Sequence, residues 1–421
     1  MPEEIFSPFI IDEFNLSDEE LKKIEIAIVL INAELKRKKK EKLNFIGKLY
    51  YPFYFIPITK KFGMIIDALK LFSEKIRLKD IESIASMDPS SILGDPTSDM
   101  FIDKIKEFSK KVENLVKSRG EKINLEGLIS PNFMDELIPF IIKASNTSED
   151  IQKIDKKMNE DDALKLKEIF GKLFELKMGQ FIEYELKMVH AINLALKNLY
   201  NTCSSIIDNY DSKINSLDDF INLINNSFSV DEIQKYQSEF DKKYSEMDKV
   251  KVEKLKDLDK KEDILLNAKS RIHESYNILI KYVIDIQKEV EEYGIEITDD
   301  MPLNSESITL FYLPIYIVEF LDKKPRFQYI VPIHLFEKKK STQISEHSKN
   351  FKEFEHIIEK NYNNNLFHGV SKSDILNILE EEDLFNIYNE GIHFIGGKKW
   401  LDSGIYVKCM DFYNSFFRRN D

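Results

Sequence analysis

The chain has 421 residues, of which 43% are hydrophobic and 32% charged, so it is long enough to bury a sizeable core and to form two or three domains. Its formal net charge of -13 argues against a whole surface built to bind nucleic acid, because neutralising phosphates takes a basic face. The longest apolar runs, residues 24–31 and 49–58, are well short of the ~20 residues that cross a bilayer, so we expect no membrane association.

The N-terminal segment and the cysteines predict a cytoplasmic protein. The segment MPEEIFSPFIIDEF opens with two acids and lacks a basic region followed by an apolar stretch, so we expect no secretory signal. Cys203 and Cys409 lie far apart and match no CxxC or Cys/His spacing. Neither a disulfide framework nor a zinc site is implied, and we expect buried thiols and no cofactor.

The first predicted helix begins with a capping box. Ser17 precedes it, Glu20 follows three residues later, and the acidic residues between them suit the positively polarised first turn. Apolar residues then recur at helical spacing, at Leu21, Ile24, Ile28, Ile31 and Leu35. The helix ends in the basic run KRKKKEK, residues 36–42, which we interpret as a solvated helix end. The alternative is a contact with phosphates or an acidic partner.

A segment rich in aromatic and β-branched residues follows the first helix. It contains Pro52, and its composition predicts strands near a sheet edge. A related stretch appears far along the chain, where FYLPIYIV (residues 311–318) aligns without gaps on LYYPFYFI (residues 49–56). Both copies continue into a Lys-Lys turn and a second hydrophobic segment. We therefore predict two β-hairpins, over residues 44–68 and 307–336, that form an internal repeat.

The two hairpins are expected to meet in one small antiparallel sheet, because an isolated hairpin is only marginally stable in water. This arrangement brings residue 50 close to residue 315. The alternative explanation is chance similarity, since aromatic edge strands of this composition resemble one another readily.

Between the two aromatic segments the sequence is helical. Residues 98–118 predict an amphipathic helix that starts at Ser98. Further along, proline and glycine are absent over long stretches, which favours two long helices, over residues 161–208 and 231–293. Residues 209–230 are expected to supply a turn and one short helix between them.

The second long helix carries a sustained heptad pattern. Its positions follow one another in spacings of three and four: Leu265, Ala268, Ile272, Tyr276, Leu279, Val283, Ile286, Val290 and Tyr293. At 1.5 Å per residue this helix is ~90 Å long, longer than one globular core needs. We therefore expect part of it to project as a rod or to pack on a partner.

The C-terminal region is predicted to be mixed. A helix is expected to begin at Ser373 and to break near Glu382, and EGIHFIGGKKW (residues 390–400) is expected to be a Gly-rich turn. The final segment, GIYVKCMDFYNSFF, joins Trp400 in a docking core.

These patterns define the expected fold class. It is mainly α with a small antiparallel β head (α+β), and a long antiparallel coiled-coil-like helical hairpin is inserted between the two related β-hairpins. Residues 1–150 form an N-terminal α+β part with the first β-hairpin and amphipathic helices. Residues 151–297 form the helical hairpin, and residues 298–421 form the second β-hairpin and a C-terminal helical region.

No motif in the sequence predicts catalysis or metal binding. GGKK at residues 396–399 departs from a P-loop, which needs lysine directly after its second glycine, because Gly397 intervenes. Glu353 and His356 have the i, i+3 spacing of di-iron bundles, but about one such match is expected by chance in a chain this rich in glutamate. We therefore expect a non-enzymatic protein and assign no catalytic or metal-binding residue.

The leading functional hypothesis is an interaction or scaffold protein. The long helical stretch without breakers and the absence of catalytic signatures both favour it. The helical hairpin is expected to bind protein partners or a second copy of the chain.

The alternative hypothesis is a nucleic-acid-binding or processing accessory factor. In it, tyrosine rings of the β head stack on bases while cations hold phosphates. The candidate stacking residues are Tyr50, Tyr54, Tyr312 and Tyr316. The candidate cationic contacts, with nucleic acid or with a protein partner, are Lys36, Arg37, Lys38, Lys39, Lys40, Lys60, Lys61, Lys323, Lys324 and Arg326.

Overall fold

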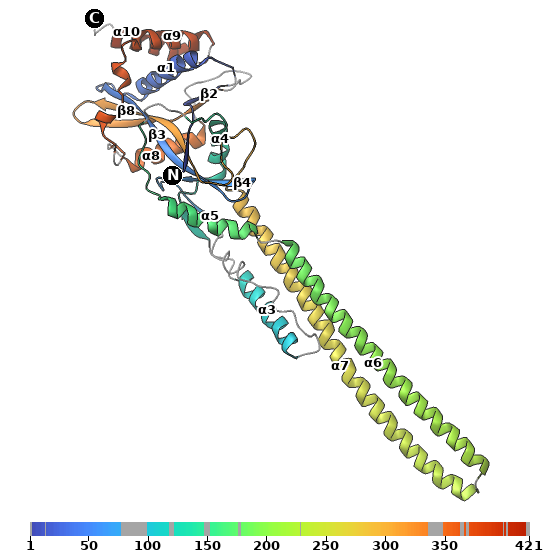
Figure 1. Cartoon of the computed structure of the whole chain (residues 1–421). Coiled ribbons are helices and arrows are strands. Elements are labelled where there is room, and N and C mark those ends of the chain that lie inside the picture. The colour runs from blue at the N-terminus through green and yellow to red at the C-terminus, as the bar shows by residue number, and fades with distance from the viewer. Residues whose placement is uncertain are drawn as a thin grey trace. The chain divides into compact units, whose positions relative to one another are not determined.

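The computed structural model of the chain (Figure 1) describes residues 2–12, 14–76, 99–117, 122–146, 152–175, 178–227, 229–335, 348–362, 366–367, 370–398, 400 and 403–417. As predicted, the chain is mainly α with some β-structure. It divides into two compact units: unit 1 comprises Met1–Ile81, Lys122–Phe174 and Gln287–Asp421, and unit 2 comprises Glu82–Glu121 and Glu175–Ile286. None of the described helices combines the length and the apolar composition that crossing a membrane needs.

Unit 1 contains the strands and most of the short helices. Its strands are β1 (Glu3–Phe6), β2 (Ile10–Asp12), β3 (Lys42–Pro57), β4 (Phe62–Asp67), β5 (Ser73–Ile76), β6 (Ile123–Glu126), β7 (Ile295–Glu296), β8 (Thr309–Leu321), β9 (Pro325–Ile330) and β10 (Ile333–Leu335). Its helices are α1 (Asp18–Lys36), α4 (Pro131–Ile142), α5 (Glu160–Glu175), α8 (Lys349–Asn361), α9 (Leu384–Gly397) and α10 (Ser403–Phe417), with 3-10 turns at Lys372–Asp374 and Ile378–Glu380.

The two predicted β-hairpins form and pair with each other. β3 and β4 make the first hairpin, β8 and β9 make the second, and β3 lies antiparallel to β8. Leu49 is opposite Ile315 and Tyr50 is opposite Pro314, which confirms the predicted proximity of residues 50 and 315. The six-stranded sheet is mixed rather than purely antiparallel, because β1 from the N-terminus lies parallel to β8.

The prediction that the prolines mark edge strands was wrong, because β3 and β8 are the two central strands. In an antiparallel pair, residues alternate between positions that bond to the partner strand and positions that point away from it. Tyr50 is opposite Pro314, and its backbone bonds away from β8: its N–H donates to the carbonyl oxygen of Gln152, and its C=O accepts from the N–H of Ile154. Tyr50 and Pro314 are therefore a pair without hydrogen bonds between the two strands. A proline, which has no N–H, fits inside the sheet at such a position.

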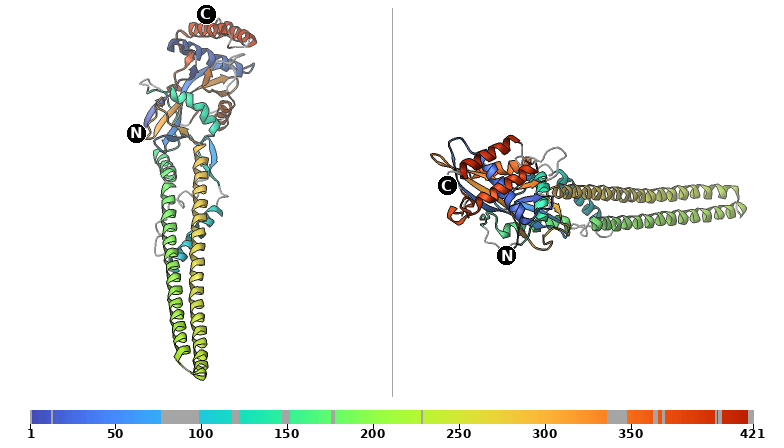
Figure 2. Two further views of the ribbon diagram at one scale, coloured as in Figure 1. Left: turned by 90° about the vertical axis from the view of Figure 1, so that its right-hand side faces the viewer. Right: turned by 90° about the horizontal axis from the view of Figure 1, so that it is seen from above.

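Two hydrophobic layers cover the sheet. One face packs against α4 and α8, through a core in which Tyr51 and Phe53 of β3 meet Phe133 and Phe354. The other face packs against α1, and α9 packs on α1. Helices α1, α9 and α10 lie together on one side of the strands in Figures 1 and 2.

Helix α1 begins as its sequence predicts. The amide N–H of Glu20 donates to Ser17 Oγ at 3.3 Å, and the amide N–H of Ser17 donates to Glu20 Oε2 at 2.9 Å. This confirms the capping box.

The predicted Gly-rich turn over residues 390–400 was wrong, because helix α9 continues through Gly391 to Gly397. A Cβ at Gly391 would lie 2.3 Å from the backbone oxygen of Lys23 on α1. Glycine is therefore used here to let two helices approach closely. A helix–helix contact of this kind leaves no signal in local sequence.

Unit 2 contains α3 (Asp99–Lys117), α6 (Met178–Ser227) and α7 (Val230–Glu291), of which α7 ends in unit 1. The first predicted long helix is divided into α5 and α6. Helix α6 then continues to Ser227, where a turn and a separate short helix were predicted for residues 209–230. Ile214, Leu217, Ile221 and Ile224 keep helical spacing there, so an apolar side is available to extend the helix.

Helices α6 and α7 run antiparallel and side by side in both views of unit 2 (Figures 1 and 2). Polar pairs join them at regular intervals: Glu185 with His273, Asn193 with Lys269, Tyr200 with Glu262, Asp211 with Lys251, and Asp218 with Tyr244. From Asn193 onward, the number of the partner on α7 falls by the same amount as the residue number on α6 rises. The register is therefore maintained from Asn193 to Asp218, while the Glu185–His273 pair is offset from it by four residues.

Candidate functional site

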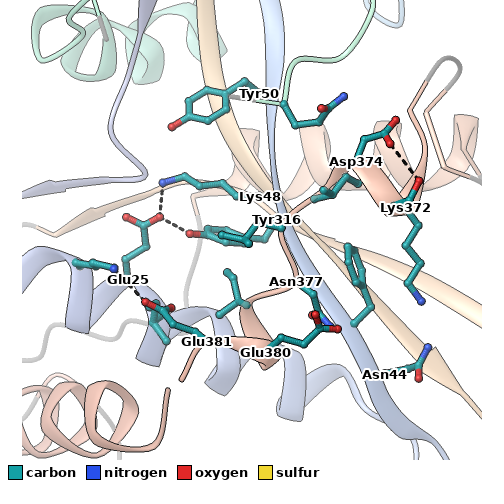
Figure 3. Close-up of a pocket in the computed structure, with 18 residues that line it drawn as sticks. Glu25, Asn44, Lys48, Tyr50, Tyr316, Lys372, Asp374, Asn377, Glu380 and Glu381 are labelled. Atoms are coloured by element: carbon teal, nitrogen blue, oxygen red, sulfur yellow. Dashed lines mark hydrogen bonds and ion pairs between the residues drawn. The ribbon is translucent and has the colours of Figure 1, made fainter. Parts of the chain in front are cut away.

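Unit 1 contains a polar cleft with a volume of about 1470 Å³ (Figure 3). Its walls come from α1, from the first half of β3 and from the segment over residues 372–381, which includes both 3-10 turns. The segments are far apart in sequence, so the cleft has no signature in any one stretch of the chain.

A lysine, a glutamate and a tyrosine form a cluster in one wall of this cleft. Lys48 of β3 is opposite Tyr316 of β8, so their side chains share one face of the sheet, and Glu25 approaches them from α1. Lys48 Nζ lies 2.6 Å from Glu25 Oε1, and the hydroxyl of Tyr316 donates to the same oxygen. Lys48 Nζ also lies 5.8 Å from the ring centre of Tyr50. Figure 3 shows the three side chains pointing toward one another.

The electrostatics of this cluster do not suit proton transfer at neutral pH. Burial alone lowers the pKa of Lys48, but Glu25 and Tyr50 outweigh that effect, so the pKa of Lys48 is raised. Burial, and then the charge of Glu25, hold the pKa of Tyr316 well above its usual value. Lys48 therefore stays an ammonium and Tyr316 a neutral phenol, and neither group is poised as a general base.

The segment over residues 372–381 is fixed against β3 and β8 by polar contacts. Lys372 Nζ lies 2.5 Å from Glu319 Oε2 of β8 and 5.0 Å from the ring centre of Phe45. The amide N–H of Ile46 donates to Asn377 Oδ1 at 3.2 Å. Each described lysine that lines the cleft pairs with a carboxylate. Within the part of the chain that the structure describes, no group of acidic, histidine or cysteine side chains has an arrangement that would hold a metal ion.

The four candidate stacking tyrosines lie on the same face of the sheet as this cluster, but three of their rings are covered. Tyr54, Tyr312 and Tyr316 are buried, and Phe6 stacks on Tyr312 at a centroid distance of 4.9 Å. Stacking on a base needs an accessible ring face. Of these four residues, Tyr50 is the one that is half-buried and lines the cleft.

The structure brings two of the predicted cationic groups together at one corner of the sheet. Arg326 of β9 donates to Glu41 Oε1 at 2.7 Å and Oε2 at 2.6 Å, and to the backbone oxygen of Lys36 at 2.9 Å. These bonds hold the segment after α1 against the β8–β9 turn. The exposed lysines gathered there, called the basic corner below, are Lys38, Lys39, Lys40, Lys42, Lys323 and Lys324.

Like Arg326, two further predicted cations are used inside the fold. Lys36 donates to the backbone oxygen of Tyr329 at 2.7 Å and pairs with Glu355, and burial lowers the pKa of Lys36 to about 8. Arg37 pairs with Glu34 at 2.6 Å. These contacts hold the end of α1 in place.

Lys60 and Lys61 lie at the opposite end of the sheet from the basic corner. They occupy the β3–β4 turn, and β3 is antiparallel to β8. The 16 residues of β3 span ~50 Å at ~3.3 Å per residue. The two Lys-Lys turns therefore do not form one compact site.

Unit 2 contains a second hollow, a groove of about 540 Å³ between α6 and α7. Its apolar lining comes from Tyr210 and Leu217 of α6 and from Met247 and Val250 of α7. The remaining lining residues are polar or charged: Lys213, Ser216, Lys243 and Glu246.

Of the residues that build the cleft, sequence reasoning named Tyr50 and Tyr316 but missed Glu25, Lys48 and Lys372. Glu25 offered a signal, because it is an acid inside the apolar run IEIAIVLI, where a buried partner is needed. Lys48 and Lys372 offered none, since exposed lysines are common throughout the chain.

In comparisons with known proteins, no family model, no curated protein and no solved structure matches this chain.

Proposed function

We propose that this protein is a non-enzymatic interaction protein, in which α6 and α7 form a coiled-coil-like hairpin that binds a partner protein. The observation that carries the proposal is a difference between two halves of the pair. One half lies beside α3 and is called the α3 half. The other, residues 199–227 of α6 and 230–262 of α7, is called the connection half.

In the α3 half the seam between the helices is closed. Met188 and Ile192 of α6 and Ile272 and Leu279 of α7 are buried. The heptad positions from Leu265 to Ile286 are all buried as well. A seam of this kind gains its stability from burying apolar area.

In the connection half the seam stays partly open. Its central residues are half-buried at Ile206, Tyr210, Ile214 and Leu217. Near the connection, Ile224 and Phe240 are buried, whereas Leu223 is 60% exposed and Val230 is 71% exposed. Apolar side chains left open on a regular scaffold are typical of a surface that a partner covers.

A shortened hairpin tests the proposal. Deleting residues 204–258 and joining the arms with a short glycine-rich linker leaves the α3 half, because the two cut points face each other in the register that the Tyr200–Glu262 and Asp211–Lys251 pairs define. Affinity purification of the full chain from its own cells, with nuclease present, is expected to recover a stoichiometric protein partner. The shortened chain is expected to lose it. A partner that stays bound to the shortened chain, or the absence of any partner of the full chain, contradicts the proposal.

The basic corner supports a second candidate function, binding of nucleic acid through phosphates. Six exposed lysines from two distant stretches gather there in a chain of net charge -13. Burial of three of the four tyrosines argues against base stacking, so contact with the phosphate backbone is the expected mode.

Charge reversal at the basic corner tests this second candidate. Lys323→Glu with Lys324→Glu is expected to weaken binding to single-stranded RNA by about tenfold or more at low salt and to flatten its salt dependence. Lys60→Glu with Lys61→Glu is the matched control, because it changes an equivalent turn at the far end of the sheet. Equal losses in both variants, or no salt-sensitive binding by the unmodified protein, contradict a site at the basic corner.

A further inference from the structure

The α3 half of unit 2 shows how the α6–α7 pair accepts a third helix. The ring of Phe108 on α3 lies 5.1 Å from the ring of Tyr276 on α7, and Ser275 Oγ donates to Ser109 Oγ at 2.8 Å. The apolar side of α3 is buried, at Phe101, Ile105, Phe108, Val112 and Leu115. An amphipathic helix thus completes the core of this half.

The groove of the connection half offers a similar apolar surface without a third helix among the described residues. Leu217, Met247 and Val250 supply aliphatic and thioether surface, and Tyr210 adds an aromatic ring. Its volume of about 540 Å³ lies within the range of pockets that bind ligands. Met247 adapts readily to different partner side chains, because its side chain is unbranched and flexible.

The charged residues that line the groove carry a net positive charge. Lys213 and Lys243 line the groove, and Lys213 and Lys254 lie 5.6 and 5.9 Å from the ring centre of Tyr210. Glu246 is the acid among the lining residues. A second copy that docked through the same groove, with the two-fold axis passing through it, would bring the lysines of both rims close together, and their like charges disfavour that contact.

We propose that the groove binds an amphipathic α-helix of a partner protein, with apolar side chains in the groove and acidic side chains against Lys213, Lys243 and Lys254. This partner helix has apolar residues at the same spacing as α3. Unlike α3, it carries excess negative charge on both sides of its apolar face. This inference rests on the proposed function, because it assigns the partner's chemistry to one part of the same hairpin.

Two synthetic peptides provide the binding test. Both place leucine and phenylalanine at i, i+3, i+4 and i+7 positions, and they differ only in carrying glutamate or lysine at the flanking positions. Fluorescence anisotropy with the full chain at low salt is expected to show at least about tenfold tighter binding of the acidic peptide. Lys213→Glu with Lys243→Glu is expected to reverse this preference. Equal binding of both peptides, or binding of neither, overturns the inference.

The Met247→Glu variant tests whether the acidic peptide binds in the groove. It places a charge among the apolar lining and is expected to weaken binding of the acidic peptide by at least about tenfold. Val252→Glu is the matched control, because Val252 is an exposed valine of the same helix that does not line the groove. Far-UV circular dichroism verifies that both variants keep their helices. Equal weakening by the two substitutions overturns the inference.

Purification of the native partner with these variants tests the groove and the proposed function independently of each other. Loss of the partner from Met247→Glu, with retention by Val252→Glu, supports the groove. A partner that stays with Met247→Glu but is lost from the shortened hairpin overturns the groove and leaves the proposed function standing. Concentration-dependent self-association of the full chain that Met247→Glu abolishes also overturns it, because a second copy would then be the occupant.

Discussion

Replacing Asp67 by alanine is expected to lower the free energy of unfolding of unit 1 by about 3–5 kcal/mol, one of the largest effects of any single substitution in the chain. Asp67 is fully buried at the end of β4. Its carboxylate accepts from the hydroxyl of Tyr51 at 2.8 Å and from the amide N–H groups of Leu69, Leu71 and Phe72 at 2.9, 2.6 and 3.2 Å. Alanine leaves all of these donors without an acceptor.

The expected loss in free energy of unfolding is large because the carboxylate and its hydrogen bonds lie in a buried turn. Burial raises the pKa of Asp67, while the donated hydrogen bonds oppose that shift. The turn that they fix contains Lys70 at a positive φ of 58°, a conformation that such a side chain adopts only when its surroundings hold it. Losing the carboxylate therefore removes both the bonds and the support for the turn.

Urea denaturation followed by the fluorescence of Trp400 measures this effect. Trp400 is the single tryptophan of the chain and is buried in the core of unit 1, so its signal follows that unit. Asp67→Asn keeps one acceptor oxygen and is expected to lose less, about 1–3 kcal/mol. Asp300→Ala changes an exposed aspartate of the same unit and is expected to stay within about 0.5 kcal/mol of the unmodified protein. An Asp67→Ala loss no larger than that of Asp300→Ala contradicts the assigned role.

Replacing Arg326 by leucine is expected to cost about 2–4 kcal/mol at pH 7, because it leaves the carboxylate of Glu41 without its partner in a nearly buried site. The side chains of Arg326 and Glu41 are 19% and 9% exposed, so solvent screens this pair only in part. The guanidinium also lies 4.7 Å from the ring centre of Phe320, so leucine removes some packing as well.

The pH dependence separates the ion pair from the packing. Hydrogen bonding to Arg326 lowers the pKa of Glu41 from 4.5 to about 2. A lowered carboxyl pKa contributes stability that is fully present above pH 4.5 and is lost as the pH falls toward 2. The stability gap between Arg326→Leu and the unmodified protein is therefore expected to narrow over that interval.

Thermal unfolding of unit 1 at pH 7, 4 and 2.5, again followed by Trp400, provides the measurement. Lys323→Leu in the adjoining β8–β9 turn is the control, since Lys323 is exposed and the substitution is expected to have little effect at any of these pH values. A gap of the same size at pH 7 and pH 2.5 would assign the loss to packing against Phe320.

The features that rest on local sequence pattern were predicted correctly. The capping box at Ser17 and Glu20 predicted the start of α1, because it satisfies backbone donors within one turn. The aromatic segments and their Lys-Lys turns predicted both β-hairpins. Their similarity led to the correct pairing of residues near 50 and 315. The internal repeat and the coiled-coil packing of α6 on α7 stay predictions.

Other features that depend on residues distant in sequence could not be predicted and became apparent only in the tertiary structure. Gly391 suggests a turn when only its local sequence is considered, but it lies inside α9, where a glycine is required because the backbone oxygen of Lys23 on α1 lies 2.3 Å from where a Cβ would be. The tyrosines of the β head have similar local surroundings in the sequence, yet Tyr54 is buried and Tyr50 borders a cleft. Residue type and spacing specify which side chains share a strand face or a helix face. Which element then covers that face depends on other segments of the chain. These are hundreds of residues away for the cleft and the basic corner, and on the following helix for the open groove, so all three became visible only in the folded protein.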